Sequence, residues 1–313
     1  MYKRRRVRII KIGLWSDAHN FPNLPLMKIS AYHKSLGDHV EMLNHLNHYD
    51  RVYASKTFSW TNDIDDLCMV YADEIVKGGT GYAIKLVNGK EVFSEDKNLP
   101  KEIEHIYPDY SLYPQYDFAV GFLTRGCPRG CGFCVVGKKE GLCSRRVADL
   151  REWWGGQKEI KLLDPNLLAC AEHESILQEL IESKAKLDIT QGFDIRLVTS
   201  DNIKLINQLN IKMIHFAWDN PKIDLTEQLR FFAEHGKIKN YSQRTVYILT
   251  NYNSTEEEDL FRIMTCFRLG FTPYQMIYDK QHSPRTVRKM QRWCNSQAIF
   301  KSCSWEEYQK GAK

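Results

Sequence analysis

Residues 116–135 read YDFAVGFLTRGCPRGCGFCV, an apolar run that passes directly into a loop with three cysteines. The run at 116–123 has the length and composition of a buried strand. Five more strand candidates follow, at 159–163, 187–190, 212–216, 244–249 and 274–277. Because helical segments separate them, the strands predict a parallel sheet of the α/β class, arranged as a partial (β/α)6 barrel open on one side. By analogy with complete barrels, functional groups are expected at the carboxyl ends of these strands, where the cysteine loop begins.

Two helices of this region have marked ends. Asp224 with Glu227, and Thr255 with Glu258, have the spacing of N-terminal capping boxes. Gly270 stands where the second helix is expected to end. These signals predict one helix in front of each of the last two strands.

The segment before the barrel predicts a smaller α/β domain. Strand patterns occur at 7–15, 39–42, 51–54 and 74–76, and a helical pattern at 23–36 is closed by Gly37. This alternation is typical of a small Rossmann-like sheet. The predicted divisions are a small α/β domain at 1–86, a proline-containing linker at 87–115, the partial barrel at 116–280 and a C-terminal helical extension at 281–313. The extension is expected either to cap the barrel or to line its entrance.

Composition places the chain among soluble globular proteins. It has 313 residues, of which 43% are hydrophobic and 27% charged, and a net charge of +5. It has neither an apolar run of about 18 residues, as a membrane span requires, nor the apolar core of a signal peptide. We therefore expect a cytoplasmic protein without membrane contact, whose nine cysteines are free thiols or metal ligands rather than disulfides.

The three thiols of the loop indicate an iron-sulfur cluster. Cys127, Cys131 and Cys134 lie within eight residues, and thiolates are the usual ligands of such clusters. A cubane has four irons, so three local cysteines leave one iron open, as a catalytic metal site requires. The alternative is a structural zinc site completed by Cys143. A zinc site would not explain why the loop follows the first of six strands.

The remaining cysteines are scattered. Cys68, Cys170 and Cys266 lie in apolar surroundings that are typical of core residues. Cys294 and Cys303 have no neighbouring partners in the sequence. No second cluster is therefore predicted, and a metal role for either of these two is left open.

The spacing of three and then two residues between the loop cysteines, with Phe133 directly before the last, resembles the signature of the radical S-adenosylmethionine (SAM) superfamily. The resemblance implies a [4Fe-4S] cluster whose open iron chelates the amino and carboxylate groups of SAM. In that family an electron from the reduced cluster, delivered by a donor such as flavodoxin or ferredoxin, cleaves SAM to a 5′-deoxyadenosyl radical. The resemblance also implies that Phe133 lies beside this cofactor.

Beyond the loop, residues 116–280 resemble the branch of this superfamily that contains methylthiotransferases and cobalamin-domain enzymes. The resemblance implies that the following side chains, after the second to fourth strands, approach SAM: Asp164, Asn166, Gln191, Asp194, Arg196 and Asp219. Arg196 suits the cofactor carboxylate, and Asp194 or Asp219 suits its ribose hydroxyls or ammonium group. The segment HFAWD at 215–219 departs from the branch, which usually carries a small residue and Glu there.

The N-terminal domain carries landmarks similar to those of cobalamin-binding domains. They are Asp17, His19, Ser55, Gly78 and Gly79. In that family the histidine coordinates cobalt, the serine supports the nucleotide base, and the glycines let the nucleotide tail pass. Pro22 stands where the histidine motif normally has glycine, and related enzymes keep a similar domain without cobalamin. A scaffold without this cofactor is the favoured interpretation, and cobalamin binding is the alternative.

These features predict a radical SAM enzyme, an oxidoreductase or transferase, that abstracts hydrogen from an unactivated C–H bond. One alternative is a cobalamin-dependent radical methyltransferase, and an alternative of another class is a non-catalytic, metal-stabilised binding protein. The substrate is open among RNA, a peptide and a small metabolite, and the positive charge together with the resemblance to this branch leans toward RNA. The catalytic residue, the oligomeric state and whether SAM is consumed or regenerated are also open.

Overall fold

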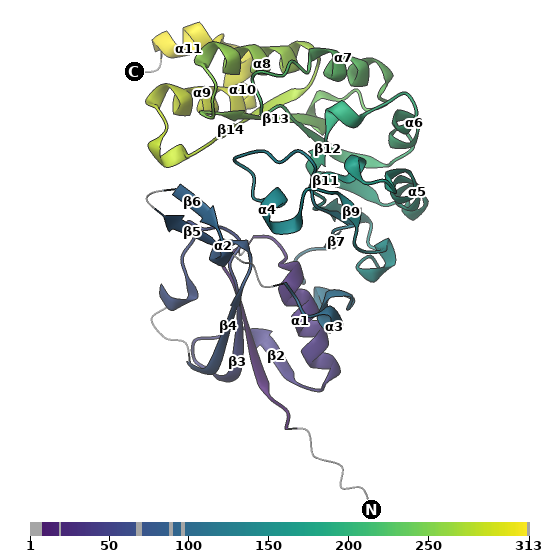
Figure 1. Cartoon of the computed structure of the whole chain (residues 1–313), viewed down its shortest axis with the longest axis vertical. Coiled ribbons are helices and arrows are strands. Elements are labelled where there is room, and N and C mark those ends of the chain that lie inside the picture. Colours follow the sequence, from purple (N-terminus) through teal and green to yellow (C-terminus); the bar gives the residue numbers. More distant parts are fainter. Residues whose placement is uncertain (1–7, 19, 67–70, 88–89, 95–97, 312–313) are drawn as a thin grey trace, which may run out of the picture. The chain divides into compact units, whose positions relative to one another are not determined.

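The computed structural model describes residues 8–18, 20–66, 71–87, 90–94 and 98–311. It is a mixed α/β structure with two main sheets of parallel strands (Figure 1). Contacts within the chain divide it into two compact units. Unit 1 comprises residues 1–121, 129–142 and 148–157, and unit 2 comprises residues 122–128, 143–147 and 158–313.

Unit 1 is built on a four-stranded sheet with the order β2-β1-β3-β4, in which all neighbours are parallel. Its elements are β1 (Lys11–Ser16), α1 (Leu24–Ser35), β2 (His39–Met42), β3 (His48–Ser55), β4 (Tyr71–Gly78), α2 (Thr80–Ala83), β5 (Ile84–Val87), β6 (Lys90–Phe93), α3 (Lys101–Glu104), β7 (Phe118–Gly121) and α4 (Val136–Glu140). The four strands predicted for the N-terminal domain are all present near their expected positions.

Helix α1 begins and ends as its sequence predicts. The Asn23 side chain accepts a hydrogen bond from the Leu26 amide at 3.2 Å and so caps the first turn. Gly37 follows the helix with a φ of 86°, a conformation that favours glycine. Leu26 packs into the same buried cluster as Ile12 of β1, which covers one face of the sheet.

The segment 87–115, expected to be a linker, is assigned by its contacts to unit 1. It contains β6, α3 and a 3-10 turn at Tyr110–Leu112. Ile103 is buried in the cluster formed by β1 and α1, and Leu99 and Leu112 pack against that cluster. Periodicity did not reveal this role because the segment contributes single apolar side chains between prolines rather than one regular apolar face.

Strands β10 to β14 of unit 2 belong to a six-stranded sheet with the order β14-β13-β12-β11-β10-β7. The neighbours from β10 to β14 are parallel, and the order has two ends, so the described strands form an open sheet. The elements of unit 2 are β8 (Thr124–Arg125), β9 (Arg145–Arg146), β10 (Glu159–Leu162), α5 (His173–Ser183), β11 (Lys186–Phe193), α6 (Asn202–Ile206), β12 (Ile211–Ala217), α7 (Thr226–His235), β13 (Arg244–Thr250), α8 (Glu256–Arg268), β14 (Thr272–Ile277), α9 (Arg285–Asn295), α10 (Gln297–Ser302) and α11 (Trp305–Gly311). All six strands predicted from 116 onward are present.

The two faces of this sheet differ because side chains alternate along each strand. The face that packs on the helices is apolar and includes Ile160, Leu162, Leu187, Ile189, Ile214, Phe216, Val246 and Ile248. The ring of Phe216, for example, lies 4.8 Å from that of Phe232 in α7. The opposite face carries Lys161, Asp188, His215 and Tyr247. The apolar core of unit 2 is therefore on the helix side, and the other face holds polar side chains.

Two expectations about helix starts had different outcomes. Thr255 and Glu258 form the predicted capping box of α8, which confirms that signal. The box predicted at Asp224 and Glu227 is wrong, because α7 has Leu225 at its N-cap without a side-chain bond. Asp224 instead accepts the Thr226 amide at 2.9 Å and closes a short turn before the helix.

Cys170, Cys266 and Cys294 are buried, whereas Cys68 lies outside the described residues. The C-terminal segment is helical, as α9, α10 and α11. Within the described ranges, no helix is both long enough and apolar enough to cross a membrane.

Candidate functional site

Polar side chains follow three neighbouring parallel strands of unit 2. Asp164 and Asn166 follow β10, Asp194 and Arg196 follow β11, and Asp219 follows β12. The carboxyl ends of parallel strands lie at one edge of a sheet, where ligands of α/β proteins commonly bind. The predicted residues are therefore brought to one edge of unit 2.

Asn166 connects the cysteine loop to this edge. Its Nδ2 lies 3.5 Å from Cys127 Sγ and 3.4 Å from Asp194 Oδ2. Both neighbours accept hydrogen bonds, which fixes the orientation of the amide. Its Oδ1 is buried and has no hydrogen-bond partner. A buried acceptor without a partner is costly, which makes this oxygen a candidate acceptor for a ligand or water.

Arg196 is held in place by Asp194. The guanidinium donates through Nε to Oδ1 at 2.6 Å and through Nη2 to Oδ2 at 3.1 Å. The same carboxylate accepts the Arg196 amide at 3.2 Å and so fixes the backbone as well. This two-bond pairing leaves further guanidinium N–H groups for an anionic ligand, a role for which Arg is well suited.

Asp219 and Gln191 occupy different surroundings at the same edge. Burial raises the pKa of Asp219 to about 6, while the charges of Arg262 and Arg196 oppose that rise. Gln191 is exposed, and in the described part of the chain it forms no hydrogen bond with the other predicted site residues. It lies in an irregular stretch of β11, where Gly192 has a φ of 90° and a Cβ there would lie 2.6 Å from the His215 carbonyl oxygen.

Asp164 anchors the strand that leads into the cysteine loop. Its carboxylate accepts the Leu123 amide at 3.1 Å and the Thr124 hydroxyl at 2.7 Å, and also the Thr124 amide. The residue is buried, which raises its pKa to about 6, against the lowering effect of these hydrogen bonds. Its hydrogen-bond partners, Leu123 and Thr124, lie four and three residues before Cys127.

The raised pKa of Asp164 makes stability depend on pH. A carboxyl whose pKa is higher in the folded than in the unfolded state contributes stability at low pH and loses that contribution as pH rises through the folded value. We expect the free energy of unfolding of the wild type, relative to Asp164→Asn, to fall by about 2 kcal/mol between pH 4.5 and 7. Urea unfolding of both proteins at several pH values measures this difference. A constant difference would show that Asp164 is not the titrating group.

Unit 2 also holds a polar cluster that the sequence reasoning missed. His215 Nδ1 lies 2.9 Å from the Ile189 carbonyl oxygen, to which it donates a hydrogen bond. The ring stacks on Tyr247 with a centroid distance of 5.0 Å. Lys161 pairs with Asp188 at 2.8 Å, and Asp188 Oδ1 is buried without a partner. Polar residues at alternate positions of four strands were the signal that could have found this face.

The other two loop cysteines lie in the 129–142 segment of unit 1. The Cys134 amide donates to the Cys131 carbonyl oxygen at 3.0 Å, so the two form a tight turn, and both are half-buried. Phe133 lies in this turn, and Gly130 before it has a φ of 58°. Among the described residues, no group of three His, Cys, Asp or Glu side chains is arranged to hold a metal ion. The donor set of three thiols remains chemically suited to an iron-sulfur cluster.

The residues similar to cobalamin landmarks lie at the carboxyl edge of the unit 1 sheet. Asp17 accepts the Thr57 amide at 2.8 Å and the Thr61 hydroxyl at 2.5 Å. Ser55 accepts from Asn23 Nδ2 at 2.8 Å. These polar groups are satisfied by the chain itself, and His19 lies outside the described residues.

The two adjacent glycines of this edge provide a matched test of their role. Gly79 has a φ of 98°, and a Cβ there would lie 2.5 Å from the Lys56 carbonyl oxygen, whereas a Cβ on Gly78 meets nothing within 4 Å. We expect Gly79→Ala to destabilise the protein by about 2 kcal/mol or more, and Gly78→Ala to change stability by less than about 1 kcal/mol. Thermal unfolding measures both. Equal effects would contradict this packing role.

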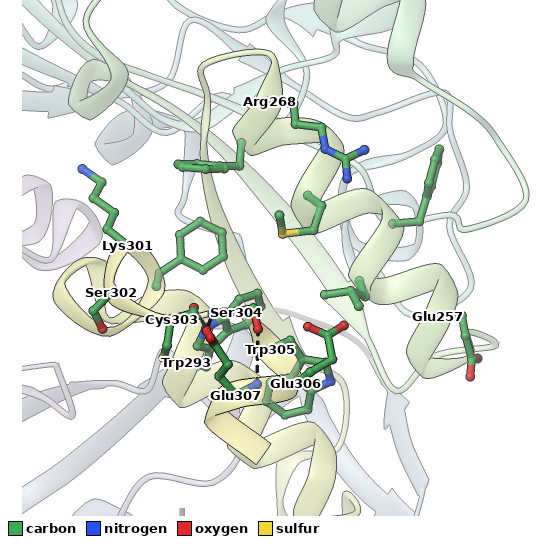
Figure 2. Close-up of a pocket in the computed structure, with 15 residues that line it drawn as sticks. Glu257, Arg268, Trp293, Lys301, Ser302, Cys303, Ser304, Trp305, Glu306 and Glu307 are labelled. Carbon is green, nitrogen blue, oxygen red and sulfur yellow. Dashed lines mark hydrogen bonds between the residues drawn. The ribbon is translucent and has the colours of Figure 1, made fainter. Parts of the chain in front are cut away.

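A separate cavity of about 760 Å³ lies between α8 and the C-terminal helices (Figure 2). Phe261 and Met264 line it from α8, and Trp293, Phe300 and Trp305 line it from the C-terminal helices. None of the residues predicted from the sequence as site residues lines this cavity.

Comparison with known proteins adds no family assignment. No model of a protein family matches the chain, and no curated protein matches it.

Proposed function

We propose that this chain is a radical SAM enzyme in which Cys127, Cys131 and Cys134 hold a [4Fe-4S] cluster. In this proposal the six-stranded sheet is the partial barrel of that superfamily, and unit 1 is a scaffold without cobalamin. The observation that carries the proposal is the contact of Cys127 with Asn166, whose amide nitrogen also contacts Asp194 and whose oxygen has no hydrogen-bond partner.

The residues of unit 2 would bind and orient the cofactor. Arg196, fixed by Asp194, directs its remaining N–H groups toward a carboxylate, and Asn166 Oδ1 accepts from an ammonium group. Asp164 holds the strand end before Cys127. When bound, the cluster and SAM supply a 5′-deoxyadenosyl radical that removes hydrogen from the substrate. The protein contributes orientation and the exclusion of water.

Anaerobic reconstitution of the full chain with iron and sulfide tests this proposal. The expected results are about four irons and four sulfides per chain, as a cubane requires, and 5′-deoxyadenosine from SAM after reduction with dithionite. Stoichiometric zinc, without sulfide and without nucleoside, would reject the enzyme and leave a metal-stabilised binding protein.

A further inference from the structure

The C-terminal region of unit 2 concentrates positive charge. Residues 280–303 contain no Asp or Glu and six Lys or Arg residues, which exceeds the net charge of +5 of the whole chain. These residues are Lys280, Arg285, Arg288, Lys289, Arg292 and Lys301. Residues 3–8 form a second such segment, with five Lys or Arg and no Asp or Glu, so the excess positive charge of the sequence lies in these two segments.

Four of these cations form a stripe on α9. Arg285, Arg288, Lys289 and Arg292 are spaced by three, four and seven residues, which places them on one side of a helix. The opposite side is buried through Met290, Trp293 and Cys294. Like charges at this spacing repel one another and destabilise a helix by a few tenths of a kcal/mol per pair. Within the described ranges, neither Arg285 nor Arg292 forms a salt bridge with an Asp or Glu side chain. A bound polyanion would relieve this repulsion.

Exposed aromatic and amide groups adjoin the start of α9. Tyr278 follows β14, is 43% exposed and contacts the ring of Tyr252 at 4.9 Å. Its amide donates to the Thr250 carbonyl oxygen and its own carbonyl accepts from Asn251, so the loops after β13 and β14 are joined. Asn253 lies exposed in the first of these loops with a φ of 53°. Four exposed or half-exposed cations thus lie on the helix that follows β14, and a ring suited to base stacking and an amide suited to a 2′-hydroxyl lie in the joined loops after β13 and β14.

We propose that this surface, formed by the α9 stripe with Tyr278 and Asn253, binds single-stranded RNA. The stripe contacts the phosphates, Tyr278 stacks on a base, and Asn253 contacts a 2′-hydroxyl. Single-stranded RNA is preferred to a duplex because an exposed ring can stack only on an unpaired base. This inference deepens the proposed function by naming the substrate class, and it rests on that function for the reaction. Binding itself requires neither cluster nor SAM.

Fluorescence anisotropy of a labelled, short single-stranded RNA with the full chain tests the proposal. Four phosphate contacts predict a slope of log K against log salt of about −3, or an affinity loss of about 50-fold between 50 and 200 mM KCl. The double variant with Arg285→Gln and Arg288→Gln loses two phosphate contacts. Its slope of log K against log salt should therefore be less negative by about 1.4. The matched control is Lys204→Gln with Arg230→Gln, which removes the same charge from α6 and α7 and should leave the slope unchanged.

Two further variants test the remaining contacts. Tyr278→Ala should weaken binding about tenfold without changing the salt slope, because stacking does not release counterions. Asn253→Ala should reduce the preference for RNA over DNA of the same sequence. The proposal would be overturned if the double variant of the stripe and the double control variant lost equal RNA affinity. Tighter binding of DNA than of RNA by the wild type would overturn it as well. Because these measurements omit iron and SAM, their failure is distinct from failure of the cluster chemistry.

Discussion

If the chain is the radical SAM enzyme proposed above, Cys131→Ala will abolish the formation of 5′-deoxyadenosine from SAM, while the protein keeps its fold. In the proposed function Cys131 is one of only three ligands, and the cluster has no other local thiolate between residues 127 and 134 to replace it. We expect the loss of at least about 1,000-fold in nucleoside formation, the effect typical of removing an essential catalytic group. Anaerobic turnover with dithionite, together with iron and sulfide analysis, measures it. Circular dichroism of the variant checks the fold.

Cys143→Ala is the matched control for this prediction. Cys143 is exposed and lies outside the loop, and its recorded hydrogen bond is to the Ser144 carbonyl oxygen. In a radical SAM enzyme its loss should leave iron content and nucleoside formation nearly unchanged. In a four-cysteine zinc site its loss should release metal as Cys131→Ala does. Equal metal loss from both variants would therefore favour the zinc-binding alternative.

The strands were predictable because each has a short apolar run between helical patterns. The run at 244–249, for example, appears as β13 at Arg244–Thr250. Helix ends were predictable where a side chain forms the cap, as at Asn23 and Thr255. Asp224 shows the limit of this reasoning, because the same residue type also closes turns by accepting an amide two residues on.

The candidate site was less predictable than the strands. Sequence reasoning identified Asn166 and Asp194 as polar residues after strands, but their contact joins residues 28 positions apart. It proposed a cofactor contact for Asp164 beside a structural role, but it did not identify the backbone groups at Leu123 and Thr124 that the carboxylate holds. Such roles depend on which loop meets which strand end, and a single sequence does not contain that information. The polar face around His215 was not predicted, because only the apolar residues of each strand were used to identify the sheet. The polar residues that alternate with them were not considered as a face.

Arg262→Met will destabilise unit 2 strongly, and it illustrates a role that no local pattern indicated. Arg262 is 1% exposed in α8 and donates to the Trp218 carbonyl oxygen at 2.6 Å and the Leu249 carbonyl oxygen at 2.9 Å. It also pairs with the buried Asp259 at 2.5 Å. Methionine fills the volume but removes the donor that Asp259 and the two carbonyls share. Removing one partner of a buried ion pair costs about 3 to 5 kcal/mol.

Urea unfolding and hydrogen exchange of α8 should both report this loss, and Arg230→Met is the matched control. Arg230 forms an exposed pair with Glu227 in α7, and such surface pairs contribute less than about 1 kcal/mol. Since Arg262 joins α8 to the ends of β12 and β13, faster exchange should extend to the Asp219 strand end. Comparable losses in the two variants would contradict the burial argument. A large loss confined to Arg262→Met would show that the edge carrying the candidate site depends on this buried guanidinium.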